Sequence, residues 1–305
     1  TAWGDSEYGG CNSGETPSAG ATCAPADGGY TTISSTVSAF AALKGDGSVT
    51  AWGYSTSGGS GAPTDGGYTT IVSAQRAFTA LKDDGSITAW GHSSYGGDNA
   101  PIDGGYTTIV STQRAFAALK DEGSITSWGH SSYGGDNAPT DDGYTSIFST
   151  EYAFAALKED GSITVWGHSA YGGSGAPTDD GYVTIFSTLG AFAALNSSGS
   201  IAVWGNSMHG GSGAPTTGTY ATIASTVYAF AAIPQATSYA YGPVNGTLGG
   251  MQKQVGETLL ASAGLNLLHN VTNLTQADLT KLAQINTSAA AITAVLTTTA
   301  TMADM

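Results

Sequence analysis

Histidine residues and adjacent acidic residues recur along the chain, and both residue types can carry chemistry. Histidine follows a Trp-Gly pair at three places, His92, His130 and His168. Three imidazoles can hold a zinc ion when each lies about 2.0–2.1 Å from it. Adjacent carboxyl groups could act as a general acid and a general base. Such pairs occur at Asp83-Asp84, Asp121-Glu122 and Glu159-Asp160.

The regular recurrence of these residues argues against both kinds of site. Each set returns every 38 residues, so its members belong to successive copies of one structural unit. Equivalent side chains of successive units converge only if they line a common axis. The acidic pairs lie where tight turns are expected, in water, so their pKa values are not driven apart as acid–base catalysis requires. We therefore expect no catalytic residue, no metal site and no enzymatic activity.

The segments between the repeated units offer a second set of candidates. Each places a tyrosine shortly before an Asp-Asn pair in a glycine-rich stretch: Tyr95, Asp98 and Asn99, then Tyr133, Asp136 and Asn137. An aromatic ring near amide and carboxylate groups suits a carbohydrate, so these six residues are the candidate ligand-binding residues. Oxygen-rich loops also suit Ca²⁺, which takes about six to eight oxygen ligands. A structural calcium ion is therefore an open alternative, and no other cofactor is expected.

A repeat of 38 residues fills most of the chain. A tyrosine opens a β-branched stretch at Tyr30, Tyr68, Tyr106, Tyr144, Tyr182 and Tyr220. In the unit that starts at residue 68, the segments 68–73, 77–82 and 86–90 have the composition of strands. Asp83-Asp84-Gly85, which joins the last two, has the composition of a tight hairpin turn.

Both faces of these strands carry small or apolar side chains. In 77–82, Phe78 and Ala80 face one way, while Ala77 and Leu81 face the other. A small sheet that is apolar on both faces must be covered on both, and blades stacked radially achieve this. The pattern predicts an all-β fold, a β-propeller of six full repeats with six or seven blades. An open β-solenoid is the competing architecture.

The stretch 153–175, AFAALKEDGSITVWGHSAYGGSG, resembles the repeat of the regulator of chromosome condensation family. The positions that match its hairpin turn, Trp-Gly pair and linker are Leu157, Asp160, Gly161, Trp166, Gly167, Gly172, Gly173 and Gly175. The resemblance covers residues 1 to about 242 and implies a propeller, commonly of seven blades. These units are shorter, however, and His mostly replaces the Asn after Trp-Gly. The chain looks more like an Ala/Ser/Gly-rich variant found in large secreted proteins.

The N-terminal residues bear on the number of blades. The chain starts inside a repeat, with the sequence TAWG at 1–4. This segment either adds a strand to the edge of a neighbouring sheet in a six-bladed ring, or belongs to a seventh blade completed by upstream sequence. An unpaired sheet edge would need one of these covers.

The two cysteines, Cys11 and Cys23, both lie in the first linker, which is longer than the others. We expect a disulfide that closes this enlarged loop, and therefore an oxidising compartment. Asn-x-Ser/Thr sequons, candidate glycosylation sites in such a compartment, occur at Asn196, Asn245, Asn270, Asn273 and Asn286. The expected location is extracellular or lumenal.

The charge of the chain excludes several partners. Its net charge is −15, and only eight residues are Lys or Arg. A nucleic-acid-binding protein needs a basic surface to displace counterions from phosphates, so neither DNA nor RNA is an expected partner. No stretch has the apolar composition of a membrane span, and no membrane insertion is expected.

The composition changes after about residue 250, where leucine and alanine take up helical spacing. We predict two helices, at about 251–270 and 276–298, each with an apolar stripe. The chain is thus expected to comprise a propeller over 1–242 and a helical tail over 243–305. The tail packs on the propeller or on a partner. The predicted function is a structural or adhesive scaffold that binds a protein or itself through this tail; the alternative is a carbohydrate-binding, lectin-like propeller.

Overall fold

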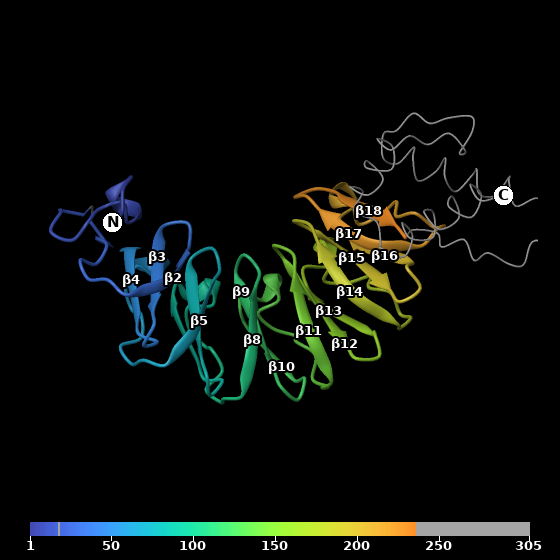
Figure 1. Ribbon diagram of the computed structural model, residues 1–305, viewed down its shortest axis with the longest axis horizontal. Helices are drawn as coiled ribbons and strands as arrows, with labels where there is room; N and C mark the ends of the chain where they lie inside the picture. Colours follow the sequence, from blue (N-terminus) through green and yellow to red (C-terminus); the bar gives the residue numbers. More distant parts are fainter. Residues whose placement is uncertain (18, 236–305) are drawn as a thin grey trace, which may run out of the picture. The chain divides into compact units, whose positions relative to one another are not determined.

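The computed structural model describes residues 1–17 and 19–235, and these contain one small antiparallel sheet for each repeat (Figure 1). The first strands are β2 (Tyr30–Ser35), β5 (Tyr68–Ser73), β8 (Tyr106–Ser111), β11 (Tyr144–Ser149), β14 (Tyr182–Ser187) and β17 (Tyr220–Ser225). The second strands are β3 (Ala39–Lys44), β6 (Ala77–Lys82), β9 (Ala115–Lys120), β12 (Ala153–Lys158), β15 (Ala191–Asn196) and β18 (Phe230–Pro234).

A third strand and a short 3₁₀ turn follow in the first five repeats. The third strands are β4 (Val49–Tyr54), β7 (Ile87–Gly91), β10 (Ile125–Gly129), β13 (Ile163–Gly167) and β16 (Ile201–Gly205). The turns are η2 (Ser55–Ser57), η3 (Ser93–Tyr95), η4 (Ser131–Tyr133), η5 (Ser169–Tyr171) and η6 (Ser207–His209), and η1 (Ser6–Tyr8) precedes the first repeat. The second strand is the middle one, paired with both others.

Aromatic and alanine side chains fill the space between successive sheets. Within a sheet, Phe116 pairs with Trp128, and their rings stack with centres 5.4 Å apart. Phe116 is completely buried, as are its counterparts Phe78, Phe154 and Phe192. Alanines on both faces of the middle strand, such as Ala117 and Ala118, are also fully buried. Small side chains therefore let neighbouring sheets approach closely, as the sequence pattern predicts.

A glycine in each hairpin turn joins one repeat to the next. The carbonyl of Gly85 accepts a hydrogen bond from the backbone N–H of Tyr106, which begins the next sheet. Gly85 has a φ of +78°, and a Cβ there would lie 2.3 Å from that nitrogen. Only glycine fits this approach, because it has no Cβ and adopts positive φ freely.

The enlarged first linker covers part of the first sheet. A disulfide joins Cys11 to Cys23. Ala24 packs with Trp52 as its counterpart Ala62 packs with Trp90, and Ala2 joins the same cluster. The indole N–H of Trp52 nevertheless has no hydrogen-bond partner, whereas that of Trp90 donates to the carbonyl of Gly58. The N-terminal residues thus cover the first described sheet only in part.

The two end sheets differ from the inner ones in the exposure of their apolar residues. On the first sheet, Ile33 is 59% exposed, while its counterpart Ile185 in the fifth repeat is 3% exposed. On the last described sheet, Ile233 is 62% exposed, while its counterpart Leu195 is 6% exposed. Each end of the described array therefore presents an apolar face that inner sheets bury.

The predicted fold class, an all-β array of small antiparallel sheets of the β-propeller type, is confirmed for the described residues. Thr1 to Gly4 form no strand; the short strand β1 (Ala21–Thr22), from the enlarged linker, instead extends the first sheet beside β4. The chain divides after Ala236. The predicted tail at 243–305, its helices and the proposed boundary lie outside the described residues. Within those described, no helix has the length and apolarity needed to cross a membrane.

Candidate functional site

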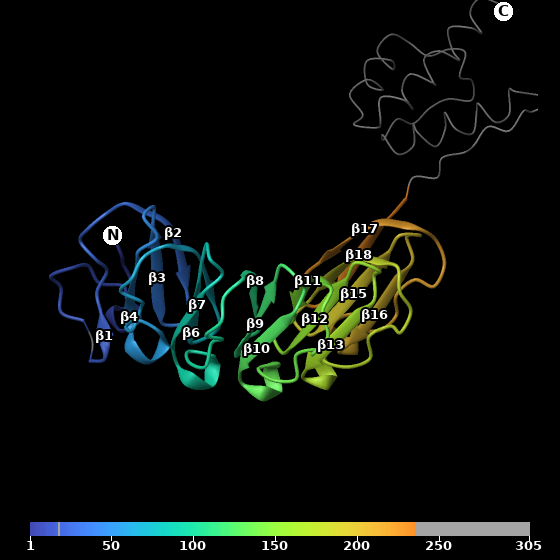
Figure 2. The ribbon, with the colours of Figure 1, turned by 90° about the horizontal axis from the view of Figure 1, so that it is seen from below.

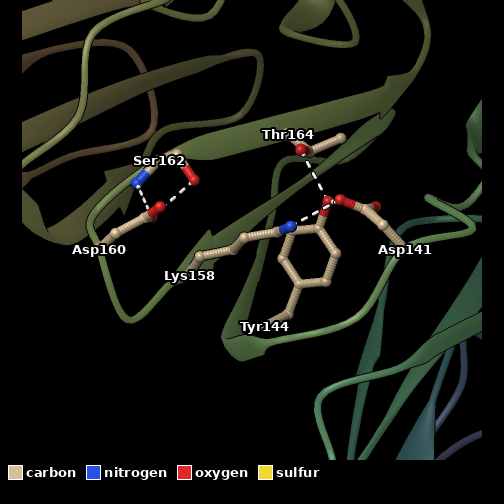
Figure 3. A network of polar contacts seen from close by, with 6 residues as sticks. All are labelled: Asp141, Tyr144, Lys158, Asp160, Ser162 and Thr164. Carbon is tan, nitrogen blue, oxygen red and sulfur yellow. Dashed lines mark hydrogen bonds and ion pairs between the residues drawn. The ribbon is translucent and has the colours of Figure 1, made fainter.

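A cluster of four polar residues lies at the start of the sheets of the second, third and fourth repeats, and Figure 3 shows the fourth. In the fourth repeat, Lys158 Nζ donates to Asp141 Oδ2 at 2.6 Å, and Tyr144 Oη donates to Asp141 Oδ1 at 2.9 Å. The hydroxyl groups of Tyr144 and Thr164 are hydrogen-bonded at 2.8 Å. The hydrogen bond from Lys158 holds the pKa of Asp141 below its usual value, and burial raises the pKa of Tyr144. The cluster ties the linker to the hairpin.

The same cluster recurs, which identifies it as part of the repeat rather than as a single site. Its equivalents are Asp65 with Tyr68, Lys82 and Thr88, and Asp103 with Tyr106, Lys120 and Thr126. In the first repeat, Lys44 and Tyr30 both donate to Asp27. Since every carboxylate here already has a lysine partner, the cluster offers no free acid or base.

The fifth repeat has an asparagine where the fourth has Lys158, and this difference allows the role of the lysine to be tested. Asn196 pairs with Tyr182 where Lys158 pairs with Tyr144 in the fourth repeat. Burial, followed by the hydrogen bond to Asp179, raises the pKa of Tyr182 to about 12. We expect N196K to lower the pKa of Tyr182, because a nearby ammonium group stabilises the phenolate. Tyrosinate absorbance during a pH titration measures this, with Y182F identifying the transition; an unchanged value would contradict the prediction.

The acidic pairs lie in the hairpin turns. Asp160 Oδ1 accepts hydrogen bonds from the backbone N–H and the hydroxyl of Ser162, and these bonds lower the pKa of Asp160 (Figure 3). Asp84 Oδ1 likewise accepts from the N–H of Ser86. The preceding carboxylates, Asp83 among them, are exposed. The second member of each pair thus shapes the turn, and both members are exposed to water.

The recurring histidines cap the 3₁₀ turns. His92 Nδ1 accepts a hydrogen bond from the backbone N–H of Ser94 at 3.2 Å, and His130 and His168 do the same in their own turns. Each ring also meets the tyrosine three residues later edge-on, as His92 meets Tyr95. In the described ranges, 1–17 and 19–235, no group of three His, Cys, Asp or Glu side chains is placed to hold a metal ion.

The candidate ligand-binding residues of the linkers do not form one cluster. Asn99, with a φ of +58°, donates from Nδ2 to Asp98 Oδ1 at 2.8 Å, and both residues are exposed. Asp136 and Asn137 behave in the same way. Tyr95 and Tyr133 instead join a different arrangement of side chains. The predicted linker site is thus divided between an exposed Asp-Asn pair and this arrangement.

Tyr95 and Tyr133 belong to a row of aromatic and basic side chains that crosses five repeats. This arginine–tyrosine row consists of Arg76, Tyr95, Arg114, Tyr133, Tyr152, Tyr171, His209 and Tyr228. The guanidinium of Arg114 lies 4.8 Å from the ring centre of Tyr95 and 5.0 Å from that of Tyr133. The ring centres of Tyr152 and Tyr171 are 4.4 Å apart. The 3₁₀ turns that carry the tyrosines lie along one edge of the array (Figure 2).

Backbone hydrogen bonds between sheets explain why these side chains meet. The N–H of Gln75 donates to the carbonyl of Gln113, and that of Gln113 donates to the carbonyl of Glu151. Neighbouring chains joined in this way lie about 4.7–4.9 Å apart. The side chains that follow, Arg76 and Arg114, are thereby held close enough for a tyrosine from the intervening 3₁₀ turn to stack against both.

Sequence reasoning missed Arg76, Arg114 and Tyr152, although a signal was present. The repeat position that they occupy holds Ser38, Arg76, Arg114, Tyr152, Gly190 and Tyr228 in turn, while adjacent strand residues hardly change. At Gly190 the side chain is absent, and a Cβ would lie 2.5 Å from the ring of Tyr171 and 2.6 Å from that of His209. Variation at one position of a nearly uniform repeat marks a place where the repeats differ in the contacts that they make.

Of the candidate glycosylation sites, only Asn196 lies within the described residues. Its Oδ1 accepts hydrogen bonds from the N–H groups of Ser198 and Ser200 at the end of β15. The other four, Asn245, Asn270, Asn273 and Asn286, lie outside them.

Comparisons with known proteins concern the repeat fold. No family model and no curated protein matches the chain. Similar solved structures include the ectodomain of the receptor kinase CR4 from Physcomitrella patens, at 19% identity and a TM-score of 0.43, matched over 58% of this chain and 50% of that one. The CRINKLY WD40 ectodomain of the Arabidopsis thaliana receptor kinase ACR4 is 20% identical, with a TM-score of 0.43, over 58% of this chain and 63% of that one.

A third similar structure is Prp20p from Saccharomyces cerevisiae, at 16% identity and a TM-score of 0.41, over 58% of both chains. The chain therefore spans between half and two thirds of the length of these three structures. Its hairpin turns, Trp-Gly pairs and linker glycines form one small sheet per repeat, as the motifs predict. In its repeat fold, and in fold alone, the chain is similar to the regulator of chromosome condensation-like β-propellers.

Proposed function

We propose that this protein is a non-enzymatic scaffold that binds protein partners, including further copies of itself, in an extracellular or lumenal assembly. The observation that carries the proposal is the exposure of an apolar face at each end of the described array. Ile233 on the last described sheet and Ile33 on the first occupy positions that inner repeats bury.

The two end faces have complementary chemistry because the repeat makes them so. Inside the array, Ala193 and Leu195 on one sheet pack against Ile223 on the next. On the last described sheet, Ala231 and Ile233 occupy the repeat positions of Ala193 and Leu195. On the first sheet, Ile33 occupies the repeat position of Ile223. A contact between them would be head-to-tail, which forms rings or filaments. Burying an isoleucine side chain contributes about 1.5–3 kcal/mol.

The disulfide and the charge support the proposed compartment and a protein partner. Disulfides such as that between Cys11 and Cys23 persist in oxidising compartments. A net charge of −15 disfavours nucleic acid. Carbohydrate binding at the exposed Asp98-Asn99 and Asp136-Asn137 linkers remains the alternative.

Sedimentation velocity over a range of concentrations tests the end faces. We expect the wild type to associate, and the double variant I33K/I233K to remain monomeric, because a charged group in an apolar contact is strongly unfavourable. V183K is the control, since Val183 is an exposed apolar residue of β14, in the fifth repeat and away from both end faces. A monomeric wild type, or equal loss of association in V183K, would contradict the proposal.

A further inference from the structure

Among the lysines and arginines of the described residues, only the two arginines of the arginine–tyrosine row have no ion pair. All four lysines of the described ranges are paired with aspartates: Lys44, Lys82, Lys120 and Lys158. Arg76 and Arg114 have no acidic partner there, and both belong to the row. In a chain with a net charge of −15, these two arginines are the basic end of the row, and the carboxylate of Glu151 lies near its Tyr152.

Arg114 is held in place in a way that suits a ligand. Its guanidinium lies between the rings of Tyr95 and Tyr133, which fixes the group by cation–π contacts. Its Nε is buried and has no hydrogen-bond partner. The buried Nε is not accessible to a ligand, but an arginine fixed in one orientation loses little entropy when its terminal N–H groups bind a carboxylate. His209 Nδ1, farther along the row, is also buried without a partner.

We propose that the row docks an extended acidic polypeptide segment of a partner protein, with carboxylates on Arg76 and Arg114 and neighbouring side chains against Tyr133, Tyr152 and Tyr171. This inference rests on the proposed scaffold function and names the partner chemistry for a second surface. Tyr and Arg are the residues enriched at protein interfaces, where they supply much of the binding energy. Arginine clusters recognise acidic motifs through bidentate, charge-assisted hydrogen bonds.

The geometry of the rings favours a peptide over an anionic glycan. Sugars bind aromatic residues through free ring faces, whereas Tyr152 and Tyr171 stack on each other with centres 4.4 Å apart. Tyr133 is similarly engaged, by Arg114 on one side and by Tyr152, at 5.2 Å, on the other. Arg76 is exposed, and Arg114 and Tyr133 are half-buried, so part of each side chain is accessible. These groups suit side-chain carboxylates and apolar peptide groups.

Fluorescence anisotropy with the full-length protein tests the proposal. The probe is a labelled short peptide of alternating glutamate and glycine, and its counterpart has glutamine in place of glutamate. We expect the glutamate peptide to bind and the glutamine peptide not to, with binding weakened by added salt. R76Q/R114Q is expected to reduce the association constant at least about tenfold, because charge-assisted hydrogen bonds are lost.

K82Q/K120Q is the matched control, since it removes the same charge from the aspartate-paired clusters away from the row. It should leave peptide binding within about twofold of the wild type. Equal loss in both double variants, or no binding of the glutamate peptide, would overturn the proposal. Tighter binding of polygalacturonate than of the peptide would overturn the assignment to a peptide.

Self-association through the end faces and peptide binding by the row are separate proposals, and different variants test them. I33K/I233K should abolish self-association without changing peptide affinity, because Ile33 and Ile233 are not part of the row. R76Q/R114Q should leave self-association unchanged. An unchanged melting temperature in R76Q/R114Q, together with lost binding, distinguishes a docking role from a purely structural one.

Discussion

Alanine at Gly85 is expected to lower the free energy of unfolding by about 3 kcal/mol. Gly85 has a φ of +78°, a region that costs an L-residue about 1–2 kcal/mol. The new Cβ would also lie 2.3 Å from the backbone nitrogen of Tyr106 and 2.4 Å from that of Gly105. The second and third repeats would have to move apart, and overpacking of this kind costs about 1–3 kcal/mol more. Urea unfolding followed by tryptophan fluorescence measures the loss.

Gly105 is the control for this prediction, because it has a similar φ of +85° but a Cβ at this residue would meet no atom within 4 Å. G105A should therefore lower the free energy of unfolding only by the cost of the positive φ, about 1–2 kcal/mol. The difference between the two variants isolates the close approach between repeats. Since each repeat contacts chiefly its neighbours, G85A should also separate unfolding into two phases. Equal losses in G85A and G105A would show that the turn does not join the repeats as described.

The repeat fold could be predicted because every unit carries its own local signals. Strand composition, the Asp-Gly turn and the Trp-Gly pair each act within about 20 residues, and their repetition adds to the evidence. The disulfide loop followed from the two cysteines, but the packing of Ala2 into the cluster around Trp52 did not. That contact depends on how a linker folds back onto a sheet, which no local pattern encodes.

The arginine–tyrosine row could not be predicted from local sequence patterns, because it depends on contacts between repeats. Arg114 contacts Tyr95, 19 residues away in a different repeat, only because backbone hydrogen bonds bring the turns of successive sheets together. The linker tyrosines were identified, but as partners of Asp98 and Asp136 rather than of the arginines. Residues that vary at one repeat position were the available signal. Positions fixed by packing stay constant between repeats, and this one changes from Arg to Tyr to Gly.

Alanine at Phe116 is expected to lower the free energy of unfolding by about 3–5 kcal/mol. The ring is fully buried, stacks on Trp128, and packs against Gly96, where even a Cβ would lie 2.6 Å from it. Removing the ring leaves a cavity beside Trp128 and Gly96, within a core cluster that also includes Ala77 of the preceding repeat. Because the surrounding sheets can collapse only in part, most of the packing energy is lost. Urea unfolding with a matched variant measures this loss.

Phe40 provides that matched variant, because it holds the same repeat position in the first sheet and stacks on Trp52 with the same separation, 5.4 Å between ring centres. Phe40 is only half-buried, since the first linker covers its face in place of a preceding sheet. F40A should therefore destabilise the protein by about half as much as F116A, in proportion to the smaller buried area. Equal losses would mean that the first sheet is covered as fully as an inner one. The end face at Ile33 would then be no contact surface, and the head-to-tail assembly would lose its basis.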